Sequence, residues 1–185
     1  MIPRFCDSAF LRSRIFAIPH FQANFFSRRI DPDLANILIE VCGGNPDCVR
    51  PNVASPLWHT MKFELVFDKV KQQFVPIIDD NESFENVKPS NIKKASPNHI
   101  HIAVLKPIED RFVINTKKPK FAEFLRTDCL EKEGFSVITI PPWDWNKMSM
   151  STESAKVEYV NKLLRENGID PKPLTRKSIQ NGFKY

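Results

Sequence analysis

The stretch that decides the fold is residues 130–145, which read LEKEGFSVITIPPWDW. Gly134 ends a helix predicted over 119–133, because glycine readily adopts the positive backbone angle that other residues avoid. The apolar, β-branched run 135–140 then predicts a buried strand. Two prolines stop that strand, because proline cannot donate to a strand ladder. Two tryptophans follow, at Trp143 and Trp145, and we expect at least one of them in the core.

Upstream of this stretch, the pattern of apolar residues predicts further elements of an α/β domain. Asp31 and Pro32 mark the start of a helix that ends before the Gly-Gly-Asn-Pro run at 43–46. Its apolar face is formed by Leu34, Ile37, Leu38 and Val41. Apolar residues alternate along 61–67, which indicates a half-buried strand. The expected elements that follow are an edge strand over 74–78, a central strand over 99–105, a short strand at 112–114 and a last helix that begins at Ser151 or Thr152 and ends at Gly168.

The order of these elements predicts the fold class. A strand, a helix and a second strand in succession imply two parallel strands with a right-handed crossover. We therefore expect an α/β domain, a small mixed sheet flanked by helices. The apolar residues of the helix at 119–133, which are Phe121, Phe124, Leu125 and Leu130, are expected to face the core.

Composition divides the chain into four segments. With 42% hydrophobic and 26% charged residues, a packed core is expected. Residues 1–30 hold five arginines and one acid, a composition typical of a mitochondrial transit peptide, although a plain basic N-terminus is the alternative. The other predicted segments are a helix and proline-rich linker over 31–54, an α/β domain over 55–166 and a basic tail over 167–185.

Cysteine and hydropathy patterns add two expectations. The four cysteines are scattered, and five residues separate Cys42 from Cys48, which is not the spacing of a zinc site. We predict reduced thiols, no metal site and no cofactor. The chain holds no apolar run of about 18 residues, so no membrane span is expected.

Three segments within residues 55–164 carry a further signal: Ser55-Pro56-Leu57-Trp58, the strand 63–68 and His101-Ile102-Ala103-Val104-Leu105-Lys106-Pro107. Together with the ending at 141–145, they resemble the C-terminal part of the FASTK (Fas-activated serine/threonine kinase) family, which ends in a RAP domain. Arg126 stands where the family usually has a lysine. The Pro141-Pro142-Trp143-Asp144-Trp145 ending is the most specific match. The large helical region that precedes this part in the family is missing from the chain.

This resemblance implies a restriction-endonuclease-like fold related to PD-(D/E)xK nucleases, and a role with mitochondrial RNA. Such nucleases hold a metal between acids on neighbouring strands. Ala103 and Leu105 stand where acids are expected, and no Glu-x-Lys occurs in the sequence. The family name also suggests protein-kinase activity. We do not expect this activity, because the sequence has no glycine-rich phosphate loop, no His-Arg-Asp and no Asp-Phe-Gly. We therefore predict a protein that is not an enzyme.

Basic residues gather between Lys88 and Lys120, where Glu109 and Asp110 are the acids. Clustered cations attract phosphate, and exposed aromatic rings stack on unpaired bases; a solvated basic face is the alternative. The predicted RNA-binding residues are Lys93, Lys94, Lys106, Arg111, Lys117, Lys118, Lys120, Arg126, Trp143 and Trp145.

The resulting hypothesis is an RNA-binding protein of the mitochondrial matrix that acts in RNA processing, stability or translation. Its RNA partner would be a mitochondrial transcript or ribosomal RNA, and its protein partners RNA-granule or ribosome proteins. Two alternatives stay open. The domain could dock a mitochondrial nuclease or the ribosome without touching RNA, or it could keep residual metal-dependent nuclease activity.

Overall fold

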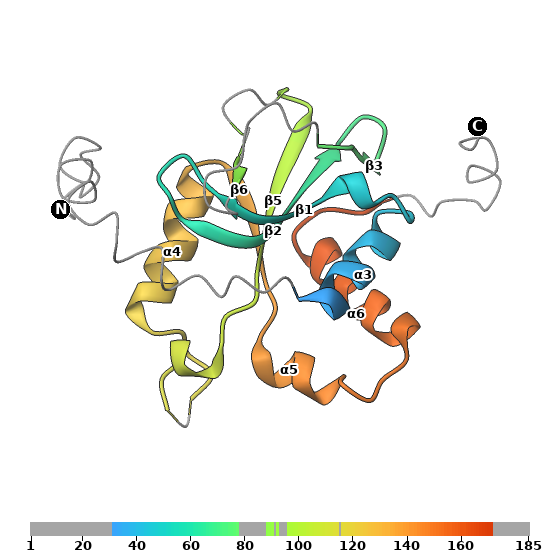
Figure 1. The fold of residues 1–185 in the computed structure, drawn as a ribbon. Helices are drawn as coiled ribbons and strands as arrows, with labels where there is room; N and C mark the ends of the chain where they lie inside the picture. The colour runs from blue at the N-terminus through green and yellow to red at the C-terminus, as the bar shows by residue number, and fades with distance from the viewer. Residues whose placement is uncertain (1–30, 78–87, 91, 93–95, 115, 172–185) are drawn as a thin grey trace.

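The computed structural model describes residues 31–77, 88–90, 92, 96–114 and 116–171 (Figure 1). The predicted segments 1–30 and most of 167–185 lie outside these residues. In chain order the described elements are α3 (Pro32–Val41), η1 (Pro46–Cys48), β1 (Val49–Ala54), β2 (Thr60–Asp68), β3 (Gln73–Phe74), β4 (Lys88–Pro89), β5 (His99–Leu105), η3 (Glu109–Arg111), α4 (Phe121–Lys132), β6 (Phe135–Thr139), α5 (Pro142–Lys147) and α6 (Glu153–Glu166).

The strands form one mixed sheet in the order β4-β1-β2-β5-β6, with β3 added beside β2. β2 runs antiparallel to both β1 and β5, whereas β6 runs parallel to β5. The chain leaves β5, forms α4 and returns as β6, which is the predicted strand–helix–strand unit. The α/β class and the central place of residues 99–105 are therefore confirmed.

The proline-rich linker predicted within 31–54 contains a strand, β1. Among the described residues, only Val53 and Ala54 of β1 pair with β4, so no described strand faces Pro51 on the outer side of β1. A strand accepts proline where no ladder hydrogen bond from its nitrogen is needed. Residues 31–54 thus contribute a helix and an inner strand to the same core as the rest of the domain.

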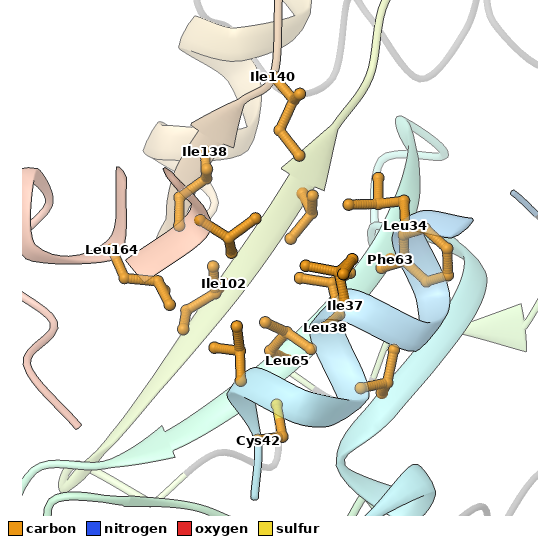
Figure 2. Close-up of a cluster of buried hydrophobic side chains, with 14 of the residues drawn as sticks. Leu34, Ile37, Leu38, Cys42, Phe63, Leu65, Ile102, Ile138, Ile140 and Leu164 are labelled. Carbon is orange, nitrogen blue, oxygen red and sulfur yellow. The ribbon is translucent and has the colours of Figure 1, made fainter. Parts of the chain in front are cut away.

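One face of the sheet is covered by α3 and α6 (Figure 2). Leu34, Ile37 and Leu38 of α3 are at most 1% exposed and pack into the cluster that contains Phe63 and Ile102 of the sheet. The i, i+3, i+4 spacing of these three residues is the helical stripe that the sequence predicts. The α3 prediction is therefore confirmed in its range and in its buried face.

The opposite face of the sheet is covered by α4, so β2 is buried on both sides. Leu130 of α4 packs with Ala103, Leu105 and Phe135 in a second cluster. Glu64, expected on a solvated face of a half-buried strand, is instead 0% exposed. The prediction of a half-buried strand is wrong, because alternation in a sequence cannot show that a helix covers the polar face.

The predicted inner face of α4 is also largely wrong. Only Glu123 and Leu130 of this helix are buried, whereas Phe121, Phe124 and Leu125 are exposed. Two short strands are smaller than predicted as well. β3 has two residues, and the expected strand at 112–114 is reduced to a single bridge between Phe112 and Pro119.

The stretch 130–145 forms the predicted helix end, turn and strand, followed by one element that the sequence analysis missed. Gly134 has φ +98°, as the predicted glycine turn requires. After β6 the chain enters the short helix α5, with Pro142 at its first position, where proline's fixed φ suits a helix start. Residues two apart on a helix point about 200° apart, so the two tryptophans separate. Trp145 is 6% exposed, and Trp143 is half-buried.

Candidate nucleic-acid interface

The loop between β5 and α4 closes on itself and presents lysines at its outer end. The Lys120 backbone N–H donates to the Arg111 carbonyl at 2.8 Å, and the Val113 N–H donates to the Lys118 carbonyl at 2.9 Å. These bonds hold the two arms of the loop side by side beneath α4 (Figure 1). Lys117, Lys118 and Lys120 are all exposed, and Arg111 is half-buried. We call these four residues the cationic loop.

Trp143 of α5 packs against the cationic loop. Its ring meets Phe112 edge to face, with ring centroids 4.6 Å apart and planes inclined by 70°. The Lys117 ammonium lies 5.6 Å from the centroid of the Trp143 ring. A cation at this distance is attracted to the ring face. The predicted residues Lys117, Lys118, Lys120, Arg111 and Trp143 are therefore brought together by the fold.

A further predicted cation, Arg126, lies in the middle of α4. Arg126 pairs with Glu123 at 3.2 Å. Burial lowers the pKa of Arg126, and the nearby charge of Arg111 lowers this pKa further, while Glu123 opposes the shift. Burial and the charge of Arg126 likewise lower the pKa of His59. Arg111 and Arg126 thus lie close enough to disfavour one another's charge, and an anion bound near them would relieve this repulsion.

Two predicted RNA-binding residues hold the fold instead. Trp145 is buried, so its ring cannot be presented to a base, and its assignment to RNA binding is wrong. The Lys106 ammonium bonds to Asp31 and lies 4.8 Å from the centroid of the Trp145 ring, and the Lys156 ammonium lies 5.7 Å from it. Lys106 is therefore partly buried and already paired with Asp31. Lys93 and Lys94 lie outside the described residues.

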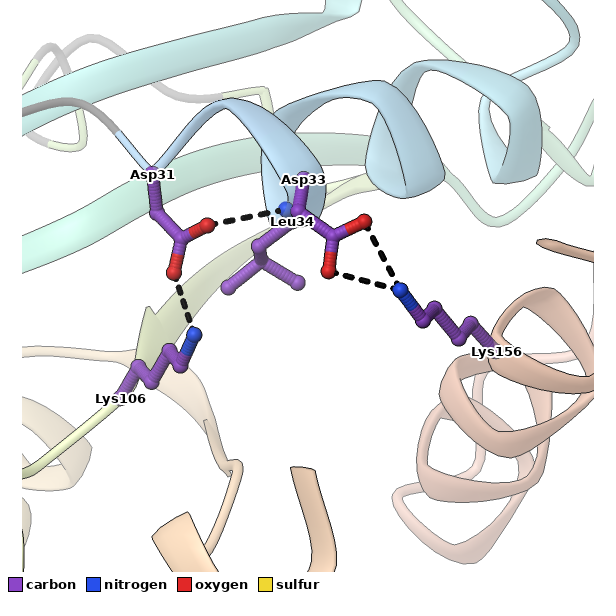
Figure 3. A network of polar contacts seen from close by, with 5 residues as sticks. All are labelled: Asp31, Asp33, Leu34, Lys106 and Lys156. Carbon is purple, nitrogen blue, oxygen red and sulfur yellow. Dashed lines mark hydrogen bonds and ion pairs between the residues drawn. The ribbon is translucent and has the colours of Figure 1, made fainter. Parts of the chain in front are cut away.

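The two lysines beside Trp145 are anchored by the start of α3 (Figure 3). Asp31 accepts from the Leu34 backbone N–H at 3.2 Å and pairs with Lys106, while both oxygens of Asp33 lie 2.9 Å from the Lys156 ammonium. Burial alone would raise the pKa of Asp31, but the bonds from Lys106 and Leu34 outweigh it and lower this pKa. These contacts tie α3 to the end of β5 and to α6.

Sequence reasoning missed a buried polar cluster under α4. Glu64 of β2 lies 2.9 Å from the His101 Nδ1, accepts a bond from the Ser90 hydroxyl and lies 3.6 Å from the Arg50 guanidinium. Arg50 and Ala103 are the residues directly opposite Glu64 on the two neighbouring strands. The pairing of Arg50 with Glu64 could have signalled this cluster only if β1 had been recognised as a strand.

The described part of the chain has neither a cluster of metal ligands nor a helix suited to a membrane. Within the described residues, no three His, Cys, Asp or Glu side chains are placed so that they could hold a metal ion. None of the helices in the described part of the chain has the length and apolar character that a bilayer crossing requires.

The half of the domain that carries the cationic loop matches a known module. Residues 110–163 match the RAP domain family model, which confirms the resemblance to RAP domain proteins. This match begins in η3 and runs through the cationic loop, α4, β6 and α5 into α6.

The relatives found are longer proteins named FAST kinase domain-containing protein 1, mitochondrial. The chain is 29% identical to the Mus musculus protein over 168 residues, which is 82% of this chain and 20% of that protein. It is 26% identical to the Homo sapiens protein over 83% of this chain and 25% identical to the Xenopus tropicalis protein over 76%. The chain thus spans about a fifth of the length of these relatives. No solved structure matches, so the restriction-endonuclease-like relationship stays a prediction.

Proposed function

We propose that this protein binds RNA in mitochondria through the cationic loop and Trp143, and that it acts there in RNA processing, stability or translation. The observation that carries the proposal is the juxtaposition of three exposed lysines with a half-buried tryptophan inside the segment that matches the RAP domain. When such lysines contact RNA phosphates, counterions are released and binding is favoured. An accessible indole ring can stack on an unpaired base.

We further propose that the domain has no catalysis of its own. In support, Ala103 stands on the central strand directly opposite Glu64, where a nuclease would pair two acids. The Glu64 carboxylate is fully buried and engaged with Arg50, Ser90 and His101. A hydrated cation would have to displace this network to reach it.

The proposal is tested by changing the three lysines to glutamine together. Lys117→Gln/Lys118→Gln/Lys120→Gln is expected to weaken binding of single-stranded RNA and to reduce the log–log salt slope by about two units, at roughly 0.7 per lost phosphate contact. The melting temperature should hardly change, because exposed cations contribute little stability. Filter binding at a series of salt concentrations measures the affinity and the slope.

A matched control removes the same charge elsewhere. Lys69, Lys71 and Lys162 are also exposed, and they lie in the β2–β3 turn and on α6. The Lys69→Gln/Lys71→Gln/Lys162→Gln variant should keep the parental affinity if the cationic loop is the site. Equal losses in both variants would mean that only net charge matters. Parental binding by the cationic-loop variant would refute the assignment.

The alternative class is a protein-docking module, and the exposed apolar face of α4 favours it. In that reading the domain would hold a mitochondrial nuclease or the ribosome and would never touch RNA. Absence of measurable binding to single-stranded RNA at low salt would favour docking over our proposal.

For localisation we propose the mitochondrial matrix, with residues 1–30 as the targeting segment. Its support is the arginine-rich, acid-poor composition of these residues together with the word mitochondrial in the names of the relatives. Residues 1–30 fused to a fluorescent protein should direct it to the matrix. Changing Arg4, Arg12, Arg14, Arg28 and Arg29 to glutamine should leave the fusion cytosolic, and matrix import of that variant would contradict the proposal.

A further inference from the structure

The outer face of α4 exposes two phenylalanine rings to water. Phe121 is 76% exposed and Phe124 is 58% exposed. They are three residues apart on the helix, so they lie on one side of it as neighbours. Leu125 continues this side and is 43% exposed. Single exposed apolar residues are normal, but adjacent ones on one helix mark an interaction surface.

The charges around these rings indicate what binds there. Phe121 directly follows Lys120, the last residue of the cationic loop, whose other lysines are also exposed. The acid of the first turn, Glu123, is buried and paired with Arg126. At the start of α4 the rings therefore border on positive charge, the acid of the first turn is turned away from solvent, and Asp128, one turn beyond Phe124, is paired with Lys132. Such a border suits a polyanion better than an apolar protein helix.

We propose that Phe121 and Phe124 are stacking platforms for the bases of single-stranded RNA, whose phosphates contact the cationic loop. This inference rests on the proposed function and adds to it the class of RNA. Base–aromatic stacking needs unpaired bases, since the faces of paired bases are covered within a duplex. Every base has a stacking face, so this part of the surface selects strandedness rather than sequence.

Four variants distinguish stacking from simple apolar contact. Phe121→Ala/Phe124→Ala removes the rings, Phe121→Leu/Phe124→Leu keeps apolar bulk without a ring, and Phe121→Tyr/Phe124→Tyr keeps both rings. Val70→Ala is the control, because Val70 is 72% exposed in the β2–β3 turn. The probe is a labelled oligouridine of about twelve nucleotides, within the range that single-strand-binding modules cover. Fluorescence anisotropy gives its affinity, and a hairpin duplex of similar length is the competitor.

Stacking predicts a specific pattern of affinities. The alanine and leucine variants should each lose about fivefold or more per ring, hence roughly 25-fold or more for the pair. The tyrosine variant and Val70→Ala should bind as the parent does, and the duplex should compete poorly. Thermal melting of every variant should match the parent, because the changed side chains are exposed.

Three outcomes would overturn the inference, and they have different meanings. If the parent binds the oligouridine but the alanine variant binds equally well, the rings are not part of the RNA surface, and the proposed function stands. If the alanine variant loses affinity and the leucine variant keeps it, the contact is apolar packing rather than stacking. If the parent binds no RNA at low salt, the proposed function itself fails, and α4 becomes a protein-docking face.

Discussion

Glu64→Ala is expected to lower the free energy of unfolding by about 3–5 kcal/mol, a large part of the stability of a domain this size. The Glu64 side chain is 0% exposed, and the Arg50 side chain beside it is 3% exposed. Removing the carboxylate takes from the buried Arg50 guanidinium its ion pair with Glu64. The same change deprives His101 and Ser90 of their shared acceptor. Urea denaturation followed by circular dichroism measures the loss.

Two comparison variants separate charge from hydrogen bonding. Glu64→Gln keeps an acceptor for Ser90 and His101 but removes the charge, so its loss should be smaller than that of Glu64→Ala. The double variant Arg50→Met/Glu64→Met should lose less than the sum of its two single variants, because a buried ion pair replaced by apolar side chains often costs little. A loss below about 1 kcal/mol for Glu64→Ala would contradict this account of the cluster.

Trp145→Ala is expected to cost about 3–5 kcal/mol as well, for a different reason. Its ring is 6% exposed and belongs to the cluster that joins α3, α6 and the sheet. Lys106 and Lys156 both lie beside the ring, so the alanine variant loses packing and two cation–π contacts at once. The cavity would also remove support from the lysines that anchor the start of α3.

The control for this prediction is Trp143, two residues away on the same short helix. Trp143 is half-buried and packs edge to face on Phe112. Trp143→Ala should cost only about 1–2 kcal/mol, close to the worth of one aromatic pair, while it weakens RNA binding under the proposed function. Trp145→Phe should recover most of the stability. Equal melting temperatures for the two alanine variants would show that Trp145 is not the central residue of the core.

The sequence predicted elements well where local chemistry decides them. Asp31 and Pro32 start α3, Thr152 caps α6 through the Ala155 N–H, and Gly134 turns the chain into β6. Each of these signals acts within a few residues. The parallel pairing of β5 and β6 was also predictable, because a helix between two strands restricts how they can pair.

The predictions failed where the structure depends on contacts between segments that are far apart in the sequence. Strand β1 was missed because it contains Pro51, and a proline normally argues against a strand inside a sheet. The phenylalanines of α4 are spaced along one face of the helix, but this spacing does not show whether another element covers that face. For the candidate site, the composition of the cationic loop was visible in the sequence, whereas the separation of Trp143 from Trp145 depended on α5. The pairing of Lys106 could not be recognised without Asp31, which is 75 positions away in the sequence.

The strand order has a consequence for where this module begins and ends. The segment that matches the RAP family model, 110–163, contains β6 but not β1, β2 or β5. β6 pairs with β5, so a fragment limited to 110–163 would keep the cationic loop and α4 but lose the strand against which β6 is built. The recognisable signature and the unit that folds are thus different stretches of chain, and the folding unit extends back at least to Asp31. In this chain the matched segment begins nearly eighty residues after the start of the folding unit.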